Sequence, residues 1–432
     1  MAHAGAQGEP IDASTRRYTL FLLVVVYTSS FIDRSIINIL VQPIKEEFGV
    51  SDTAMGFLTG FSFAIFYAGL GLPVAMLADR SNRRNIIAWA VAIWSGMTAL
   101  CGAAQNFWQL AAARIGVGIG EAGAGPPSHS MIADMYPLRE RTSAMAIYSW
   151  GIHIGLMFGA LIGGMVEDAY GWRAAFLVVG IPGLALALLV RFTVREPARG
   201  VADTVHAAPN KQGLADAFVH LWRIRSLRHT ITGCTLVAFV GYGISAWGAA
   251  FLMRSHGLTG KEVGLLMGPA GGFMGIIGAI VAGKLADRMS EKDPRWTPWV
   301  VAVSKVVAIP LVFLFYLPDN LWIAMLAFIP MIALAATYQG STFAMVQTLS
   351  PLRMRAQASA ILLFVINLIG LGLGPVAVGL ISDLLLPYYG SDSLRYSLII
   401  VSMLGLWGAW HYYLAGRHYR EDLEISQGKV MA

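Results

Sequence analysis

The chain carries little charge. Only 13% of its 432 residues are Asp, Glu, Lys or Arg, whereas a soluble domain carries about 25%. Hydrophobic residues make up 56% without counting glycine, so too little polar material remains to cover a water-facing surface. The two cysteines, Cys101 and Cys234, lie in apolar runs and indicate no disulfide framework. These shortages argue against a soluble enzyme, a nucleic-acid-binding protein and a disordered chain.

What the sequence has instead is long apolar runs. A helix needs roughly 20 mostly apolar residues to cross a membrane, and twelve such runs are present. The predicted spans are 18–41, 53–77, 85–104, 108–134, 142–166, 174–194, 229–253, 262–286, 297–317, 320–347, 356–385 and 394–416. The first run is too long for a removable signal peptide and lacks a small-residue cleavage site. We therefore expect an all-α membrane protein with twelve transmembrane helices.

The positive residues indicate the orientation. If the N-terminus is cytoplasmic, the inner segments hold 23 of the 31 Lys and Arg residues and the outer loops hold five. Positive residues favour the cytoplasmic side. Both termini are therefore predicted to be cytoplasmic, and the net charge of +6 is read as a topology signal and not as a nucleic-acid surface.

Three landmarks recur at nearly half the chain length, which is 216 residues. Leu77-Ala78-Asp79-Arg80 returns 208 residues later, Pro137-Leu138-Arg139-Glu140-Arg141 returns partly after 214, and Asp168 returns as Asp383 after 215. Two parallel six-helix repeats are typical of transporters that rock two halves around a central site.

The repeat predicts the domain organisation. We expect a cytoplasmic tail over 1–17, six-helix bundles over 18–194 and 229–416, a cytoplasmic linker over 195–228 and a tail over 417–432. The later part of the linker has the pattern of a basic amphipathic helix, which either lies on the inner leaflet or is a solvated helix.

Several motifs resemble those of the major facilitator superfamily. Asp79-Arg80-Ser81-Asn82-Arg83-Arg84 resembles its loop-2/3 signature, and Gly283 to Arg288 resembles the second copy. Arg114 with Gly118 and Gly120 resembles the span-four signature, and Gly155-x-x-x-Gly159-Ala160 is similar to a span-five motif common in exporters. The resemblance covers the whole chain and implies two pseudo-symmetric six-helix bundles.

The sequence departs from the general pattern in an informative way. Asn82 replaces a glycine, and an Asp-Arg-x-Asn-Arg loop resembles the Spinster-like branch, as do Ile32-Asp33-Arg34 and Gly118-Ile119-Gly120-Glu121-Ala122. This resemblance implies transport of lysophospholipid- or sphingolipid-type amphiphiles.

Four ionisable residues are predicted to lie deep in the spans of the first half: Asp33, Arg34, Arg114 and Glu121. Each costs roughly 2.5–3.5 kcal/mol on insertion scales, so such residues are functional by default. We interpret Asp33 and Glu121 as protonation sites, because burial favours a neutral carboxyl and an arginine partner favours a charged one. Arg34 and Arg114 would pair with these acids or hold an anionic headgroup. The alternative is a neutral ion-pair network that only locks helices together.

The second half has no Asp or Glu deep in a span. Lys305 is expected to snorkel to the inner interface. The expected substrate cavity is lined by Tyr27, Phe31, Phe61, His129, Trp150, His153, Tyr242, Trp247, Tyr338, Gln339 and Asn367.

The expected cytoplasmic gate consists of Asp79, Arg80, Arg83, Asp134, Asp287 and Arg288, and the alternative is a plain positive-inside role. His129 and His153 have no partners at metal-ligand spacing, so no metal is predicted.

Together these features predict a proton-coupled secondary transporter of lipid-like amphiphiles. A proton/drug antiporter is the alternative of the same class, and a transporter-fold receptor or scaffold is the alternative of another class. An enzyme is not expected, because no catalytic constellation is present. We expect no cofactor other than protons, a monomer surrounded by membrane lipids, no nucleic-acid partner, and a bacterial inner membrane as the location.

Overall fold

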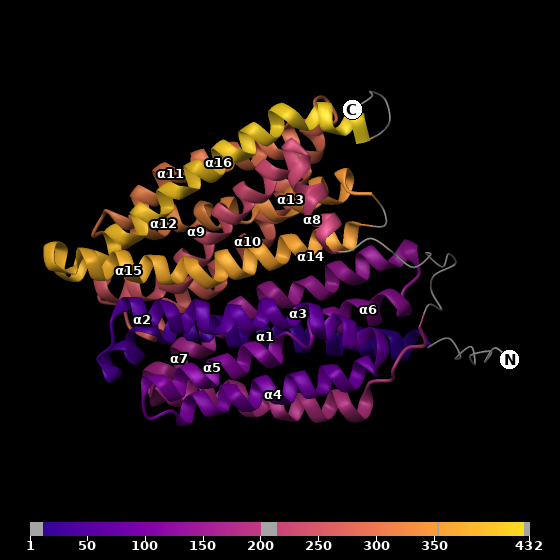
Figure 1. Ribbon diagram of the computed structural model, residues 1–432. Helices are drawn as coiled ribbons and strands as arrows, with labels where there is room; N and C mark the ends of the chain where they lie inside the picture. Colours follow the sequence, from indigo (N-terminus) through magenta and orange to yellow (C-terminus); the bar gives the residue numbers. More distant parts are fainter. Residues whose placement is uncertain (1–11, 200–213, 352–353, 427–432) are drawn as a thin grey trace. The chain divides into compact units, whose positions relative to one another are not determined.

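The computed structural model describes residues 12–199, 214–351 and 354–426 (Figure 1). These ranges consist of helices and short connections and contain no strand, which confirms the all-α prediction. Parts of both predicted tails and of the predicted linker lie outside the described residues.

The helices that come first in the chain are joined by short connections. They are α1 (Ala13–Phe48), α2 (Asp52–Gly56), the π-helical turn η1 (Phe57–Phe61), α3 (Ser62–Arg80), α4 (Arg83–Ala103), α5 (Phe107–Glu121), α6 (Gly125–Met135) and α7 (Leu138–Thr193). Side chains cap several of their N-termini, because the first backbone N–H groups of a helix have no partner within it. Asn82, for example, accepts from Asn85 N, and Asn106 accepts from Gln109 N.

The later helices follow the same plan. They are α8 (Leu214–Arg223), α9 (Arg225–His256), α10 (Gly260–Ser290), α11 (Trp296–Tyr316), α12 (Leu321–Ala335), α13 (Thr337–Leu349), α14 (Arg355–Val365), the π-helical turn η2 (Ile366–Leu371), α15 (Gly372–Tyr389), the 3₁₀ turn η3 (Gly390–Asp392) and α16 (Ser393–Ser426). Thr259 and Glu262 form a reciprocal capping box at the start of α10.

Nine helical stretches of the described residues are long and apolar enough to cross a membrane. Two of them contain a turn-like break, at Gly171 (φ +81°) inside α7 and at Gly390 (φ +53°) after α15. Glycine adopts these positive φ values without a Cβ clash. Helices α5 and α6 together form one further membrane span, which is interrupted between Glu121 and Gly125. The described helices are therefore consistent with the twelve predicted spans.

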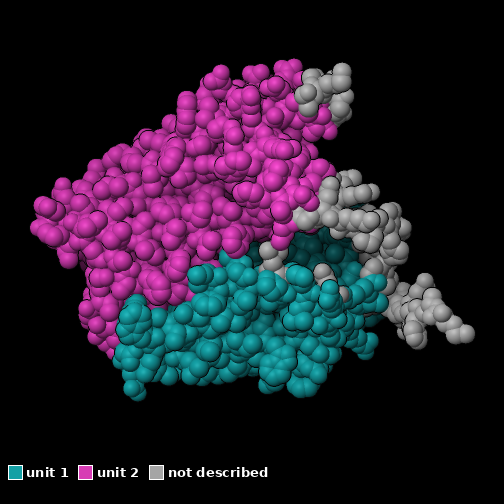
Figure 2. Space-filling model, viewed as in Figure 1, with its two compact units in different colours: residues 1–36, 65–209 teal, residues 37–64, 210–432 magenta. Residues whose placement is uncertain are grey.

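The chain divides into two compact units, shown in two colours in Figure 2. Unit 1 contains residues 1–36 and 65–209, and unit 2 contains residues 37–64 and 210–432. The segment 37–64 belongs to unit 2 because its backbone approaches that of α15 closely. A Cβ on Gly56 would lie 2.4 Å from Pro375 O, and a Cβ on Gly379 would lie 2.2 Å from Asp52 O.

Small residues also bring the helices of unit 1 together. Helix α4 packs against both α5 and α7. A Cβ on Gly120 would lie 2.6 Å from Trp94 N, and a Cβ on Gly180 would lie 2.5 Å from Ala99 N. Such close contacts are typical of membrane helices, where small residues let backbones approach.

Unit 2 has a core around the fully buried Tyr412, whose hydroxyl bonds that of Thr342. Helix α8 contributes Leu221 to this core, while Phe218 and Trp222 stay half exposed and stack on each other.

Candidate functional site

The first part of the candidate site is an ion pair inside unit 1. Arg34 Nε on α1 lies 2.6 Å from Glu121 Oε2 at the end of α5. Ser30 Oγ donates to the same oxygen over 2.8 Å, and the Glu121 side chain has no exposed surface. The Arg34 guanidinium also lies 4.3 Å from the ring centre of Tyr67, a cation–π contact. The structure therefore brings together Arg34 and Glu121, two of the four predicted charges.

The other two charges lie beside this pair. Asp33 is only 1% exposed, and neither of its carboxylate oxygens makes a hydrogen bond within the described residues. Its charged neighbours are Glu121, Arg114 and Arg34, and the Thr98 hydroxyl lies nearby. Arg114 is 2% exposed. All four predicted charges thus lie in one cluster, which contains the direct pair of Arg34 and Glu121 and a second carboxylate, Asp33, without a hydrogen bond within the described residues.

The glycines of the exporter-like motif hold α1 in place. A Cβ on Gly155 would lie 2.4 Å from Phe31 Cβ, and a Cβ on Gly159 would lie 2.7 Å from Ser35 Cβ. Helix α7 therefore packs directly on the turns of α1 that carry Asp33 and Arg34. The motif has a local structural purpose here, which is to fix the position of the charged turn.

Aromatic residues lie next to the charged cluster in unit 1. Tyr27 stacks on the buried Tyr148 with ring centres 4.4 Å apart, and it meets Phe31 edge-on at 5.1 Å. The exposed His129 meets Tyr148 edge-on at 5.3 Å. Trp150 is exposed and His153 is partly buried. Tyr148 was not among the predicted cavity residues, although it joins two of them.

The remaining predicted cavity residues lie in unit 2. Trp247 is fully buried and its indole N–H donates to Pro375 O over 2.9 Å, so in this structure it is a packing residue. Asn367 lies in the π-helical turn η2 and donates to Leu363 O of its own helix. Gln339 is exposed on α13, whereas Phe61, Tyr242 and Tyr338 are partly buried.

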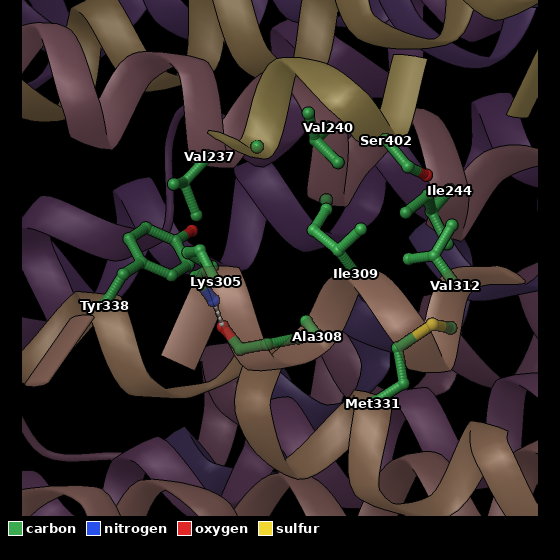
Figure 3. A pocket seen from close by; sticks show the side chains of 13 residues that line it. Val237, Val240, Ile244, Lys305, Ala308, Ile309, Val312, Met331, Tyr338 and Ser402 are labelled. Carbon is green, nitrogen blue, oxygen red and sulfur yellow. Dashed lines mark hydrogen bonds between the residues drawn. The ribbon is translucent and has the colours of Figure 1, made fainter. Parts of the chain in front are cut away.

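The snorkelling prediction for Lys305 is wrong. The residue is only 8% exposed, and its Nζ (Figure 3) lies inside the unit. Nζ donates to Leu334 O over 2.7 Å and to Ala335 O over 3.4 Å. These carbonyls belong to the last turn of α12, which ends at Ala335. Carbonyls at a helix end lack intrahelical partners, so the ammonium stays inside unit 2 to satisfy them.

The predicted gate residues are only partly brought together. Arg83, which is 1% exposed, pairs with Asp134 and with Glu196, whose Oε1 lies 2.8 Å from its Nε. It also donates to Ser130 Oγ and Pro197 O. All of these groups are in unit 1. Glu196 was not predicted, since it lies just beyond the sixth span.

Three other predicted gate residues, Arg80, Asp287 and Arg288, form no ion pair within the described part of the chain. Arg80 is exposed at the end of α3, and Asp287 and Arg288 are exposed near the end of α10. The side chain of Asp79 lies outside the described residues.

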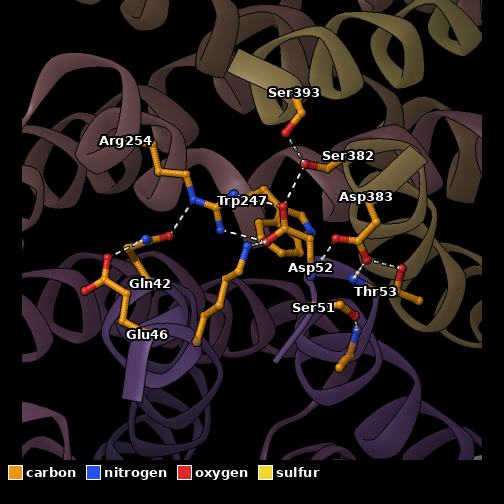
Figure 4. Close-up of polar contacts among 12 residues, drawn as sticks. Gln42, Glu46, Ser51, Asp52, Thr53, Trp247, Arg254, Ser382, Asp383 and Ser393 are labelled. Atoms are coloured by element: carbon orange, nitrogen blue, oxygen red, sulfur yellow. Dashed lines mark hydrogen bonds and ion pairs between the residues drawn. The ribbon is translucent and has the colours of Figure 1, made fainter. Parts of the chain in front are cut away.

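A second ionic cluster, which we name the Asp52 lock, escaped the sequence reasoning. It consists of Asp52, Lys45, Arg254, Gln42, Ser382, Asp383 and Thr53 (Figure 4). The Arg254 guanidinium donates from two nitrogens to the two carboxylate oxygens of Asp52, over 2.7 and 2.8 Å. Lys45 Nζ lies 2.6 Å from the same carboxylate. Asp52 itself is 2% exposed.

The lock joins parts of unit 2 that come from different sequence repeats. Asp383 on α15 accepts from the backbone N–H groups of Asp52 and Thr53, at 3.0 and 2.7 Å, and so caps the N-terminus of α2. The sequence signals were indirect: Lys45 and Arg254 are two of the few basic residues in the predicted outer loops, and Asp383 is a landmark of the sequence repeat.

Comparison with known proteins gives a consistent result. The model of the major facilitator superfamily matches residues 23–375. An "MFS-type efflux pump" of Mycolicibacterium smegmatis is 35% identical over 404 residues, which is 93% of each chain. "Protein spinster homolog 1" of Homo sapiens is 27% identical over 91% of this chain and 80% of that protein. A crystal structure of a bacterial homolog to the human lysosomal transporter Spinster, in an inward-facing and unoccupied conformation, is 32% identical, has a TM-score of 0.88 and covers 95% of this chain and 99% of that one.

The chain belongs to the major facilitator superfamily, a family of multi-pass membrane transporters. Within that superfamily it is of the Spinster type. The predictions of the fold, of the family and of a transporter in place of an enzyme are thereby confirmed.

Proposed function

We propose that the chain is a proton-coupled secondary transporter of lipid-like amphiphiles, working by alternating access. The observation that carries this proposal is the buried cluster of unit 1, in which Glu121 is paired with Arg34 and Asp33 has no hydrogen bond. Proton coupling needs a carboxyl group whose protonation changes with its partners. This cluster holds two carboxyl groups, one paired with an arginine and one without a hydrogen bond within the described residues.

Asp33 is the group proposed to hold a proton in the described arrangement. An ionised carboxylate that is fully buried without hydrogen bonds is costly, and such a group neutralises instead. Arg114 and Arg34 are close enough to interact with it electrostatically. A rotation of α1 by part of a turn would move a guanidinium from Glu121 to Asp33. Glu121, left without its arginine partner, would then take up the proton, and Asp33 would release its own.

The Asp52 lock and the Arg83 cluster are the proposed conformational latches. The lock holds residues 42–53 of the first sequence repeat to residues 254 and 383 of the second. A transporter that alternates must break such a contact in one of its states. We propose that Arg83 and Asp134, together with Asp79, Arg80, Asp287 and Arg288, act at the opposite, cytoplasmic side.

The proposed substrate has an anionic or zwitterionic head and an apolar tail. In unit 1, Phe31 lies 5.1 Å from the Arg34 guanidinium and meets Tyr27 edge-on. Unit 2, taken by itself, contributes the uncharged residues Tyr242, Tyr338, Gln339 and Asn367. The similarity to Spinster homologs favours lysophospholipid- or sphingolipid-type molecules. The similarity to a mycobacterial efflux pump supports the second candidate, a proton/drug antiporter. We further propose that the protein lies in a bacterial inner membrane with both termini in the cytoplasm, and that it works as a monomer without a cofactor.

Proteoliposome flux tests this proposal. A labelled lysophospholipid and a cationic dye would each be followed in vesicles with and without an imposed pH gradient. We expect gradient-dependent movement of the lysolipid and its loss in Glu121→Gln, because the amide cannot release a proton. The matched control is Glu291→Gln, which removes an exposed carboxylate. Movement of the dye alone would favour the antiporter, and pH-driven flux that persists in Glu121→Gln would contradict the coupling role.

A further inference from the structure

Unit 2 contains a second polar feature that the proposed transport mechanism does not use. A cavity of about 140 Å³ lies between α9, α11, α12, α13 and α16 (Figure 3). Its wall is apolar, with Val237, Ile244, Ile309, Val312 and Met331 among the lining residues. The Lys305 ammonium lies in this wall, beside the Tyr338 ring at 5.7 Å.

The cation of Lys305 has no anionic partner in the described part of the chain. Its two hydrogen bonds go to neutral carbonyls, and the third N–H makes none there. The two carbonyls stabilise the ammonium form of Lys305, and an anion that accepts its third N–H would add the missing counter-charge through a charge-assisted hydrogen bond.

The helix break beside Lys305 repeats the break beside the charged cluster in unit 1. The fourth span of the first repeat breaks after Glu121, where α5 ends, and the tenth span breaks after Ala335, where α12 ends. Ala335 lies 214 residues after Glu121, the same offset that relates Pro137 to Pro351. Broken helices in transporters are found where substrates and ions bind. The break in the first repeat carries Glu121 with an arginine, whereas the break in the second carries Lys305 with no acid.

We propose that this cavity binds a small apolar monocarboxylate, with the carboxylate on Lys305 and the hydrocarbon body against the apolar wall. The volume sets the size, since a cavity of about 150 Å³ holds one benzene ring. Ala335 and Gly241 on its rim are exposed, which provides an entry for the ligand. The site lies in unit 2 and shares Tyr338 with the proposed substrate wall, but it does not involve Asp33 or Glu121, so it does not depend on the proposed proton coupling.

The test compares two probes of similar size by fluorine NMR on the purified full-length protein. 4-Fluorobenzoate carries the charge, and 4-fluorobenzyl alcohol lacks it. We expect the wild-type protein to bind the benzoate at least about tenfold more tightly, as for a charge-assisted hydrogen bond. Lys305→Met should remove this preference and leave the two probes equal. Lys284→Met, which removes an exposed lysine of α10, should leave the preference unchanged.

Two results would overturn the assignment: a wild-type protein that binds both probes equally or not at all, or a Lys305→Met variant that keeps the benzoate preference. If Lys305→Met does not fold, a second variant tests the same proposal. Ala308→Phe fills the cavity from its wall and leaves the ammonium in place, so it should weaken both probes. Unchanged benzoate binding in Ala308→Phe would place the ligand elsewhere and refute the proposal.

Discussion

The Asp52 lock allows a prediction whose size can be worked out from the structure. Asp52→Asn removes the charge that Arg254 holds with two nitrogens and that Lys45 also contacts. Breaking a buried ion pair costs about 3–5 kcal/mol. Because the Lys45 side chain is 23% exposed, solvent weakens its interaction with Asp52. We therefore take the lower end of this range, about 3 kcal/mol, as the cost of the substitution. This corresponds to a roughly hundredfold shift between the locked and open arrangements.

Hydrogen–deuterium exchange measures this change in the equilibrium between the locked and open arrangements. The amides of Asp52 and Thr53 donate to Asp383, so opening the lock exposes them to solvent. We expect exchange of peptides over 37–61 to accelerate by up to about two orders of magnitude in Asp52→Asn. The matched control is Asp319→Asn, which also loses an Asp–Arg pair at 2.8 Å but whose Asp319 side chain is 86% exposed. Exposed pairs contribute about 0–1 kcal/mol, so this variant should change little. Exchange over 37–61 within twofold of wild type in Asp52→Asn would refute the reasoning.

Two further predictions concern unit 1. Gly180→Ala should destabilise this unit by about 1–3 kcal/mol, because the new Cβ would lie 2.5 Å from a backbone atom of α4, whereas Gly96→Ala meets only a side-chain carbon at 3.9 Å. Thermal melting compares the two, and equal melting temperatures would contradict the packing argument. Arg83→Lys should cost roughly 2 kcal/mol, because lysine cannot make the forked contacts to Asp134 and Glu196. Faster exchange of amides 190–199 than in an Arg80→Lys control is expected, and identical exchange would argue against a holding role for Arg83.

The spans and the buried charges of unit 1 could be predicted because each depends on local sequence. Twenty apolar residues have few alternatives to a membrane helix, and Asp33, Arg34, Arg114 and Glu121 stand out in such runs. Their convergence could be expected, since a carboxylate in a membrane needs a cationic partner. The particular pairing of Glu121 with Arg34 could not, because it depends on how α1 rotates against α5.

The residues that sequence reasoning missed depend on distant partners. Asp52 and Arg254 are separated by 202 residues, and each alone reads as an ordinary loop charge. Lys305 was misread because the break after Ala335 leaves no Gly or Pro signal at that point, so the free carbonyls that hold the ammonium were not foreseen. Trp247 was assigned to a cavity by its residue type, but Pro375 O offers its N–H a partner inside the unit.

Infrared difference spectroscopy of the carboxyl groups tests the central claim most directly. The protein would be titrated across the physiological pH range, together with Asp33→Asn and Glu121→Gln. The account predicts a protonated-carboxyl band that grows as the pH falls and that these substitutions diminish. If both carboxyl groups stay ionised at every pH in that range, with substrate and without it, Asp33 and Glu121 do not carry the coupling proton.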